Sequence, residues 1–323
     1  MYQNIDKYIE RLITESTPDL PIWNIESIRQ GKKPHWNYID GCMITSLLAL
    51  CEITGEKKYF DFAESFIDYY VADDGSILGY DVEKYNLDDL NEGRVLFELY
   101  RKTGKEKYRT AIENQKKQLD GQPRTCTNNF WHKLIYPNQI WLDGIYMAQV
   151  FSTLYAKEYG GRDYSDMLCQ IENVNRYMRD EKSGLYYHGL DCSKSIFWAD
   201  KESGLYWQVV DQPGREGNYL ETSGSSMIAY AFIKGARLGV LSPEYRTFGK
   251  ETFDGICQRY LKTNEQGELN LGGICLVAGL GPDNNRRRDG SYEYYISEPV
   301  VENDAKGVAP FLLCYTEILR MKG

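Results

Sequence analysis

The stretch that decides the fold is Asn37–Tyr70, NYIDGCMITSLLALCEITGEKKYFDFAESFIDYY. Its first half is apolar almost throughout, whereas its second half places Lys, Asp and Glu between apolar residues at helical spacing. The TGEKKY segment between the two halves has the glycine and charged residues that are typical of a tight turn. The sequence therefore predicts a helical hairpin with one apolar helix and one amphipathic helix.

The same pattern recurs along the chain. It is found at Leu87–Leu119 with TGKEKY at the turn, at Trp141–Met178 with EYGGRDY, and at Thr222–Leu261 with LGVLSPEY. The apolar helices begin roughly 50 residues apart, and a period of this size indicates an architecture built from one repeated unit. A last apolar helix is expected at Asp304–Met321, and Tyr2–Ile13 would pair with it.

These hairpins predict an all-α protein, an (α/α)6 barrel in which six hairpins form a toroid with the apolar helices inside. An open helical solenoid is the alternative, because only about ten helices are evident and a closed ring of six hairpins needs twelve. The chain has no interior linker, so we expect a single domain that spans residues 1–323.

Composition excludes several classes of function. A net charge of −9 argues against nucleic-acid binding, which requires a basic surface. The N-terminus lacks the apolar core of a signal peptide, and no run approaches the roughly 20 apolar residues of a membrane span. The eight cysteines form no CxxC motif, and no His-rich motif predicts a metal site. We therefore expect a cytoplasmic protein with no metal, no cofactor and no membrane partner.

The best candidate for chemistry lies in Asn129–Phe151, NFWHKLIYPNQIWLDGIYMAQVF. This stretch holds two of the six tryptophans, one of three histidines and a single carboxylate, Asp143. The spacing of Asp143, Met147 and Val150 predicts one face of a helix, preceded by a loop that would lie over the helix start.

Acids also open the apolar helices of the first two repeats, at Asp40 and at Asp88–Asp89. An Asp in this place is often a helix cap, which is the alternative explanation for each of them. In an α/α ring, however, the starts of the inner helices gather at one mouth, so Asp88 and Asp143 would face each other. Two carboxylates in different environments are the usual groups that cleave a glycosidic linkage.

With these residues noted, the chain resembles the unsaturated rhamnogalacturonyl hydrolases of glycoside hydrolase family 105. The matching stretches span nearly the whole chain: WNYIDG, LDDLNEGR, FWHKLIYPNQIWLDGIYM, GLYYHGLD, FWADKESGLYWQVVDQPGREGNYLETSGSSM and RDGSYEYYISEPVVENDAKGVAPFLL. The resemblance implies a six-hairpin barrel that hydrates the C4=C5 double bond of a terminal unsaturated uronic acid. Asp143 would protonate C4 and help water to add at C5, and Asp88 would support it.

The resemblance also implies the residues that bind an oligosaccharide with an unsaturated uronyl end. They are Tyr38, Asp40, Trp131, His132, Lys133, Trp141, Met147, His188, Trp207, Arg215, Glu221, Thr222 and Lys306. Lys133, Arg215 and Lys306 are the candidates for binding the substrate carboxylate. Many family members carry an R-x-N-G-W run where this chain has LETSGSSM, which leaves the role of Arg215, the uronide and the neighbouring sugar open.

Three other functions are alternatives. An unsaturated glucuronyl hydrolase would use the same chemistry on other uronate oligosaccharides, and an α/α-barrel epimerase would use paired histidines as acid and base. A non-catalytic helical repeat scaffold would spread its aromatic residues over a concave binding face. The gathering of aromatic residues in loops before the apolar helices favours an enzyme. The sequence leaves the oligomeric state open.

Overall fold

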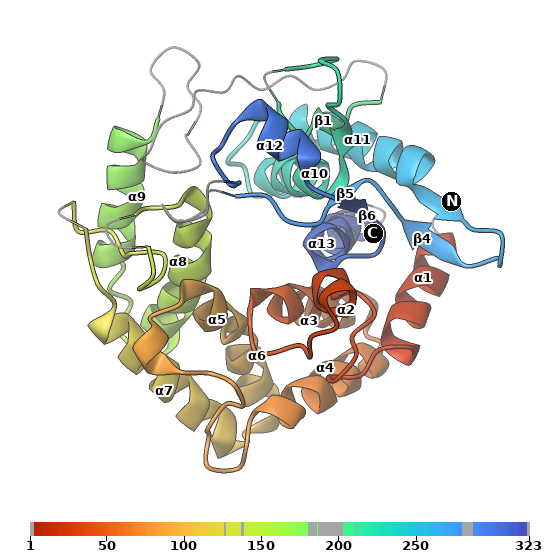
Figure 1. Ribbon diagram of the computed structural model, residues 1–323. Coiled ribbons are helices and arrows are strands. Elements are labelled where there is room, and N and C mark those ends of the chain that lie inside the picture. The colour runs from red at the N-terminus through yellow and green to blue at the C-terminus, as the bar shows by residue number, and fades with distance from the viewer. Residues whose placement is uncertain are drawn as a thin grey trace.

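The computed structural model describes residues 3–125, 127–136, 139–179, 186, 203–210, 212–279 and 287–321. It is a ring of paired helices, as Figure 1 shows, and the all-α prediction is confirmed. The pairs are α3 (Tyr38–Thr54) with α4 (Lys57–Tyr70), α5 (Leu87–Glu92) and α6 (Arg94–Thr103) with α7 (Glu106–Gly121), α8 (Leu142–Glu158) with α9 (Ser165–Tyr177), and α10 (Thr222–Arg237) with α11 (Tyr245–Tyr260).

The last helix, α13 (Ala305–Arg320), pairs with the first helix, α1 (Gln3–Thr14). The Tyr315 hydroxyl donates a hydrogen bond to Asp6 Oδ1 at 3.2 Å and so joins the two ends of the chain. The predicted pairing of the N-terminal helix with the C-terminal helix is therefore confirmed.

The apolar helices form the inner row of the ring. Helix α5 packs against α8 and α3, and α13 packs against α3 and α10 (Figure 1). Helices α4, α7, α9 and α11 lie outside this row and present their charged faces to solvent. Between α9 and β1 (Tyr206–Trp207), residues 180–185 and 187–202 lie outside the described residues.

The second apolar helix differs from the prediction because it is broken at Gly93. In a continuous helix the Asp89 carbonyl would accept a hydrogen bond from Gly93 N–H. Here it accepts from Trp36 Nε1 at 2.8 Å and from Gln115 Nε2 at 3.3 Å. Gly93 N–H bonds to the Leu90 carbonyl instead, and the Gln115 side chain occupies the space that a Cβ at Gly93 would need. Competing side-chain donors therefore divide the helix.

Short elements connect the longer helices. They are α2 (Ile25–Gln30), the 3-10 turn η1 (Val82–Lys84), α12 (Tyr292–Ser297), and three antiparallel strand pairs: β1 (Tyr206–Trp207) with β2 (Leu220–Glu221), β3 (Leu261–Thr263) with β4 (Leu269–Leu271), and β5 (Ile274–Cys275) with β6 (Val300–Val301). One large apolar cluster joins the helices, with Trp23, Trp36 and Phe66 almost fully buried in it. In the described residues, every helix is too short or too polar to cross a bilayer.

Candidate active site

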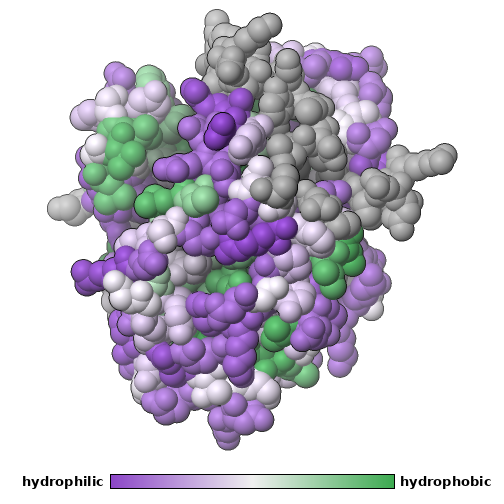
Figure 2. Space-filling model, turned by 90° about the vertical axis from the view of Figure 1, so that its left-hand side faces the viewer, coloured by the Kyte–Doolittle hydropathy of each residue, from purple (hydrophilic) through white to green (hydrophobic). Residues whose placement is uncertain are grey.

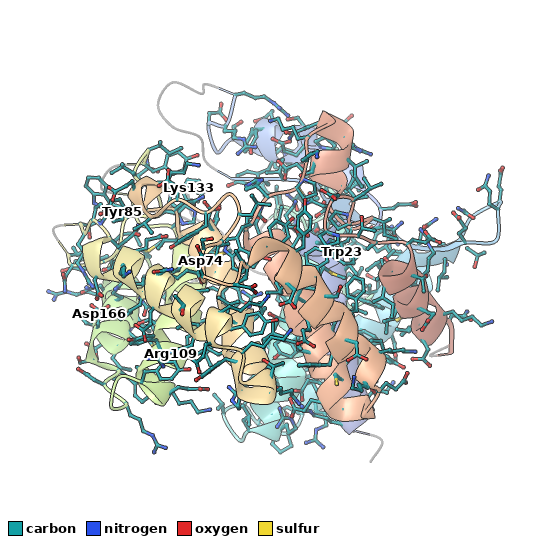
Figure 3. All side chains as sticks on the ribbon, turned by 90° about the horizontal axis from the view of Figure 1, so that it is seen from below. Trp23, Asp74, Tyr85, Arg109, Lys133 and Asp166 are labelled. Carbon is teal, nitrogen blue, oxygen red and sulfur yellow. The ribbon has the colours of Figure 1, made fainter. Side chains whose placement is uncertain are left out.

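The loop that precedes α8 lies over the start of α5. The Leu87 N–H donates to the His132 carbonyl at 3.2 Å, and Gln122 Nε2 donates to the Trp131 carbonyl at 2.9 Å. These bonds fix the loop between α5 and α7, so that its side chains reach the first turns of α5 and α8. In Figure 3, Lys133 from this loop lies near Tyr85 at one end of the ring, and Arg109 lies toward the other end.

Asp88, in the first turn of α5, is held by two residues of this loop. Its Oδ2 lies 2.5 Å from Lys133 Nζ and its Oδ1 lies 3.3 Å from His132 Nε2. Burial alone would raise the pKa of Asp88, but the His132 hydrogen bond and the Lys133 charge outweigh it and lower the pKa to about 2. Asp88 is therefore ionised over the whole physiological range of pH.

His132 belongs to an aromatic stack at the start of α8. Its ring lies 4.6 Å from the Trp141 ring with only 7° between the planes, and Tyr136 stacks on Trp141 at 5.0 Å. A Cβ at Gly144 would come within 3.0 Å of His132 Nδ1, so the glycine allows His132 to lie against α8. The stack is an apolar wall of the kind that packs against a sugar ring.

Asp143, in the first turn of α8, is the second carboxylate of the site. Its Oδ1 is buried and has no hydrogen-bond partner among the described residues. Tyr38, in the first turn of α3, lies close to both acids. Burial raises the pKa of Tyr38 well above its ordinary value, and the charges of Asp88 and Asp143 raise it further. The structure therefore brings Asp143, Asp88, Tyr38, His132, Lys133 and Trp141 together.

The helix-cap explanation for these acids is wrong. Asn37 caps α3 by accepting from Ile39 N–H, and Asn86 caps α5 by accepting from Asp88 N–H. The residue before α8 is Trp141, which makes no capping bond. The acids lie inside the first turns, where their side chains are available for other contacts.

Asp40 and Lys306 lie apart from this group, in a buried charged cluster. Asp40 is fully buried and accepts a hydrogen bond from Trp23 Nε1 at 2.7 Å. Lys306 Nζ lies 3.1 Å from Asp304 and 3.2 Å from Glu26. These contacts indicate that Asp40 and Lys306 join α3 to the start of α13.

Glu221 and Thr222 have structural partners at the start of α10. Glu221 Oε2 accepts from Gly224 N–H at 2.6 Å and its Oε1 accepts from Cys275 N–H at 3.0 Å. Thr222 Oγ1 donates to the Gly272 carbonyl at 2.7 Å. Both residues therefore anchor α10 to the segment that leads into β5.

The other predicted residues are spread more widely. Arg215 is 45% exposed, pairs with Glu293 at 2.9 Å and covers the Tyr292 ring at 3.6 Å. Met147 is a buried core residue, and Trp207 packs partly against the same core. The Trp131 Nε1 atom is buried with no partner among the described residues. His188 lies outside the described residues.

His35 is a neighbour of the site that the sequence left uncertain. Burial lowers the pKa of His35, and the charges of Lys84 and Lys133 lower it further. Its ring nitrogen lies 3.2 Å from the Asn37 amide. His35 directly precedes the WNYIDG stretch, and this position was the signal that could have indicated it.

An apolar hollow between α8 and α9 is a different feature. It has a volume of about 690 Å³ and is lined by apolar residues of α8 and α9 such as Ile145, Val150 and Ile171. Figure 2 shows the side of the ring that carries these helices, where hydrophobic residues gather in patches among hydrophilic ones. Among the described residues that line this hollow none is an acid, so the acid pair and not this hollow marks the candidate site.

Known proteins resemble the chain over most of its length. The sequence profile of Glycosyl Hydrolase Family 88 matches residues 8–205 and 199–322. A solved glycoside hydrolase from family 105 of C. acetobutylicum ATCC 824 is 36% identical, with a TM-score of 0.84 over 96% of this chain and 99% of that one.

Two curated relatives match parts of the chain. Protein Atu3128 of Agrobacterium fabrum is 44% identical over 122 residues, which are 36% of this chain, and the match spans 52%, about half, of that protein. The unsaturated rhamnogalacturonyl hydrolase YesR of Bacillus subtilis is 24% identical over 63% of this chain and 72% of its own length. Together with the helical ring and the paired acids, these matches confirm the predicted family and fold class: the chain belongs to Glycosyl Hydrolase Family 88, in a group that also includes family 105 enzymes.

Proposed function

We propose that this chain removes a terminal 4,5-unsaturated uronic acid from oligosaccharides, with the unsaturated rhamnogalacturonan disaccharide as its substrate. The observation that carries this proposal is the pair of unlike carboxylates: Asp88, held ionised by Lys133 and His132, and Asp143, with an unpartnered buried oxygen. The name of the Bacillus subtilis relative supports the choice of substrate.

The two carboxylates differ in what they can do with a proton. Asp88 has a pKa of about 2, so it cannot supply a proton near neutral pH. Asp143 lies in the first turn of α8 and has no cation among its ion pairs in the described residues, so we assign it the proton transfer. Asp88 then accepts hydrogen bonds from the hydroxyls of the sugar and holds His132 and Lys133 in place.

In the proposed reaction, the Asp143 carboxyl transfers its proton to C4 of the unsaturated sugar. The C4=C5 electron pair forms the new C–H bond, and the positive charge that develops at C5 is shared with the ring oxygen. The Asp143 carboxylate then takes a proton from a water molecule as that water bonds to C5. The hemiketal opens to a ketone at C5, and the hemiacetal left at C1 releases the neighbouring sugar.

Lys133 is the cation that we propose to bind the uronate carboxylate. Its ammonium group has three N–H donors and only one carboxylate, Asp88, among its ion pairs in the described residues.

We further propose that residues 1–323 form one catalytic domain that works on small oligosaccharides in the cytoplasm. Six cysteines of the described residues are free thiols, which supports a reducing compartment.

The test is to follow the absorbance of the conjugated unsaturated uronate in D2O. Wild-type protein should remove the absorbance of unsaturated rhamnogalacturonan disaccharide, and early product should carry deuterium at C4. Asp143→Asn should leave the absorbance unchanged. Direct cleavage at C1 would release the uronate with its double bond intact, so steady absorbance with product formation would reject the mechanism.

Unsaturated chondroitin disaccharide separates the two hydrolase functions. If only this substrate loses absorbance, the chemistry stands and the chain is an unsaturated glucuronyl hydrolase. If neither substrate reacts, the proposed function is wrong.

A further inference from the structure

Arg94, the last residue of the LDDLNEGR stretch and the first of α6, is a buried cation. It is only 5% exposed, and in the described parts of the chain its hydrogen bonds and ion pairs include no carboxylate, although its charge lowers the pKa of the buried Glu92. Removing a guanidinium group from water is costly, and a carboxylate is the usual compensation. The contacts that replace the carboxylate therefore indicate what this residue does.

The guanidinium group of Arg94 contacts three inner helices. Its Nε donates to Thr45 Oγ1 at 2.8 Å and its Nη2 lies 3.1 Å from Cys42 Sγ, both on α3. Its Nη1 donates to Asn91 Oδ1 on α5. Its plane lies over the Tyr146 ring of α8, with 5.2 Å between the guanidinium carbon and the ring centre. One side chain thus joins α3, α5 and α8.

Asn91 continues this connection from α5 to α8. It is fully buried, and its Nδ2 donates to the carbonyls of Tyr146 and Met147, each at 3.1 Å. Because Oδ1 accepts from Arg94, a flipped amide would direct its N–H groups at the guanidinium and its oxygen at two carbonyls. Arg94 therefore fixes the amide in the orientation that joins the helices.

The connection lies directly below the acid pair. Asp88 precedes Asn91 by three residues, and Asp143 precedes Tyr146 by three, which is about one helical turn in each case. We propose that Arg94, acting through Asn91 and Tyr146, sets the distance between the carboxyl groups of Asp88 and Asp143. It is a positioning residue, and the inference rests on the proposed function.

Lysine cannot replace Arg94 in this role. A planar guanidinium group presents donors in several fixed directions, whereas an ammonium group is a single compact charge. Arg94→Lys should therefore keep the charge but lose the joint contact with α3 and α5. We expect kcat to fall roughly 10- to 100-fold, because small misplacements of reacting groups have effects of this size. KM should change by less than about 3-fold, because Arg94 is not a sugar-binding residue.

Ser46→Ala is the matched control. Ser46 is fully buried and its Oγ donates to the Ala309 carbonyl at 3.0 Å, so it joins α3 to α13, away from α5 and α8. Its loss should lower the melting temperature but leave kcat within about 2-fold, because the contacts between the acid-bearing helices are intact.

Chemical rescue gives a second readout. Arg94 lines a hollow of about 260 Å³ together with Thr45, Val95 and Val150, so Arg94→Ala would open further space there. Guanidinium ion at tens of millimolar should restore kcat of Arg94→Ala at least about 10-fold, and methylammonium should not, because only a planar group reproduces the contacts. Equal rescue by both ions, or by neither, would contradict the positioning role.

A readout that needs no substrate separates this inference from the proposed function. His132 contacts Asp88 and is one of only three histidines, so its ring signals can be followed by NMR. Arg94→Lys should shift them and Ser46→Ala should not. If Arg94→Lys shifts the signals but the wild-type protein is inactive on both substrates, the positioning role is supported and the proposed function is wrong. Unshifted signals, or a wild-type kcat in Arg94→Lys, would overturn the positioning role.

Discussion

Two acids in the first turns of neighbouring inner helices meet opposite surroundings. Asp88 of α5 is buried, but hydrogen bonding to His132 and the charge of Lys133 lower its pKa to about 2. Asp40 of α3 is fully buried beside Trp23, and burial raises its pKa to about 7 although the indole hydrogen bond lowers it. A similar place in the sequence repeat thus gives a fully ionised acid in one helix and, in the other, an acid that is about half protonated near pH 7.

The neighbours of Asp40 increase the difference. Burial raises the pKa of Glu92 well above its ordinary value, and the charge of Asp40 adds to this effect. Burial also raises the pKa of Asp304, although Lys306 lowers it. The comparison teaches that the helix start does not decide the ionisation of these acids. For Asp88 the loop before α8 decides the ionisation, because that loop places Lys133 and His132 against its carboxyl group.

The largest effect should come from removing the charge of Asp88. Asp88→Asn loses the partner of Lys133 and His132, and we expect kcat/KM to fall roughly 100-fold, in the range of one catalytic interaction. Asp89→Asn is the matched control, because Asp89 is adjacent and buried and its pKa is raised to about 6 by burial. It should retain activity within about 3-fold. Equal losses in both variants would show that the two acids do not differ in function.

A smaller effect should follow from removing Lys133. In Lys133→Met the pKa of Asp88 should rise by roughly 1 unit or more, because an opposite charge at this distance has that influence. Activity that needs ionised Asp88 is lost as pH falls through its pKa, so the acid limb of kcat should move to higher pH. Lys107→Met is the control, since Lys107 pairs with the distant Asp68. Profiles of kcat that extend from about pH 2 to 7 measure the shift, and an unmoved limb would contradict the assignment.

The raised pKa of Asp40 should make the folded state less stable as the pH rises. Its folded pKa of about 7 lies above the value of 3.8 expected for the unfolded chain. Between these pH values the folded state keeps a proton that the unfolded state has lost, so stability falls as pH rises, by at most about 1.4 kcal/mol per pH unit. Asp40→Asn should make this slope shallower, because Glu92 and Asp304, whose pKa values burial also raises, keep their own contributions. Urea unfolding at several pH values from 4.5 to 7.5 measures it, and a slope unchanged from wild type would refute the raised pKa.

Much of the fold follows from the sequence. The apolar and amphipathic halves of Asn37–Tyr70 predicted both helices and their turn, and the same pattern located α8, α9, α10 and α11. The break at Gly93 could not be predicted, because it depends on donors from Trp36 and Gln115, which are far away in the sequence. Local pattern specifies the helices, and contacts between distant residues specify their interruptions.

The site was predictable where aromatic and charged residues lie close together in the sequence. Trp131, His132, Lys133, Trp141 and Asp143 form one such stretch, and the structure brings four of them into contact with Asp88 or with the start of α8. Asp40 shared the same position in the repeat, yet its side chain faces Trp23. The face to which a first-turn acid points is set by packing in three dimensions, which the repeat alone does not give.

The smallest effect should come from Arg215, which the sequence offered as a partner for the substrate carboxylate. Its pair with Glu293 is exposed on both sides, and pairs of this kind contribute roughly 0 to 1 kcal/mol. Arg215→Gln should therefore change the free energy of unfolding by less than about 1 kcal/mol and kcat/KM by less than about 2-fold. Arg237→Gln is a useful contrast, because it removes both hydrogen bonds that Arg237 donates to the buried Glu317 and should destabilise the fold more. Lys133→Met should be measured on the same substrate for comparison. If Arg215→Gln lowers kcat/KM and Lys133→Met does not, the uronate carboxylate binds near α12 and away from the acid pair.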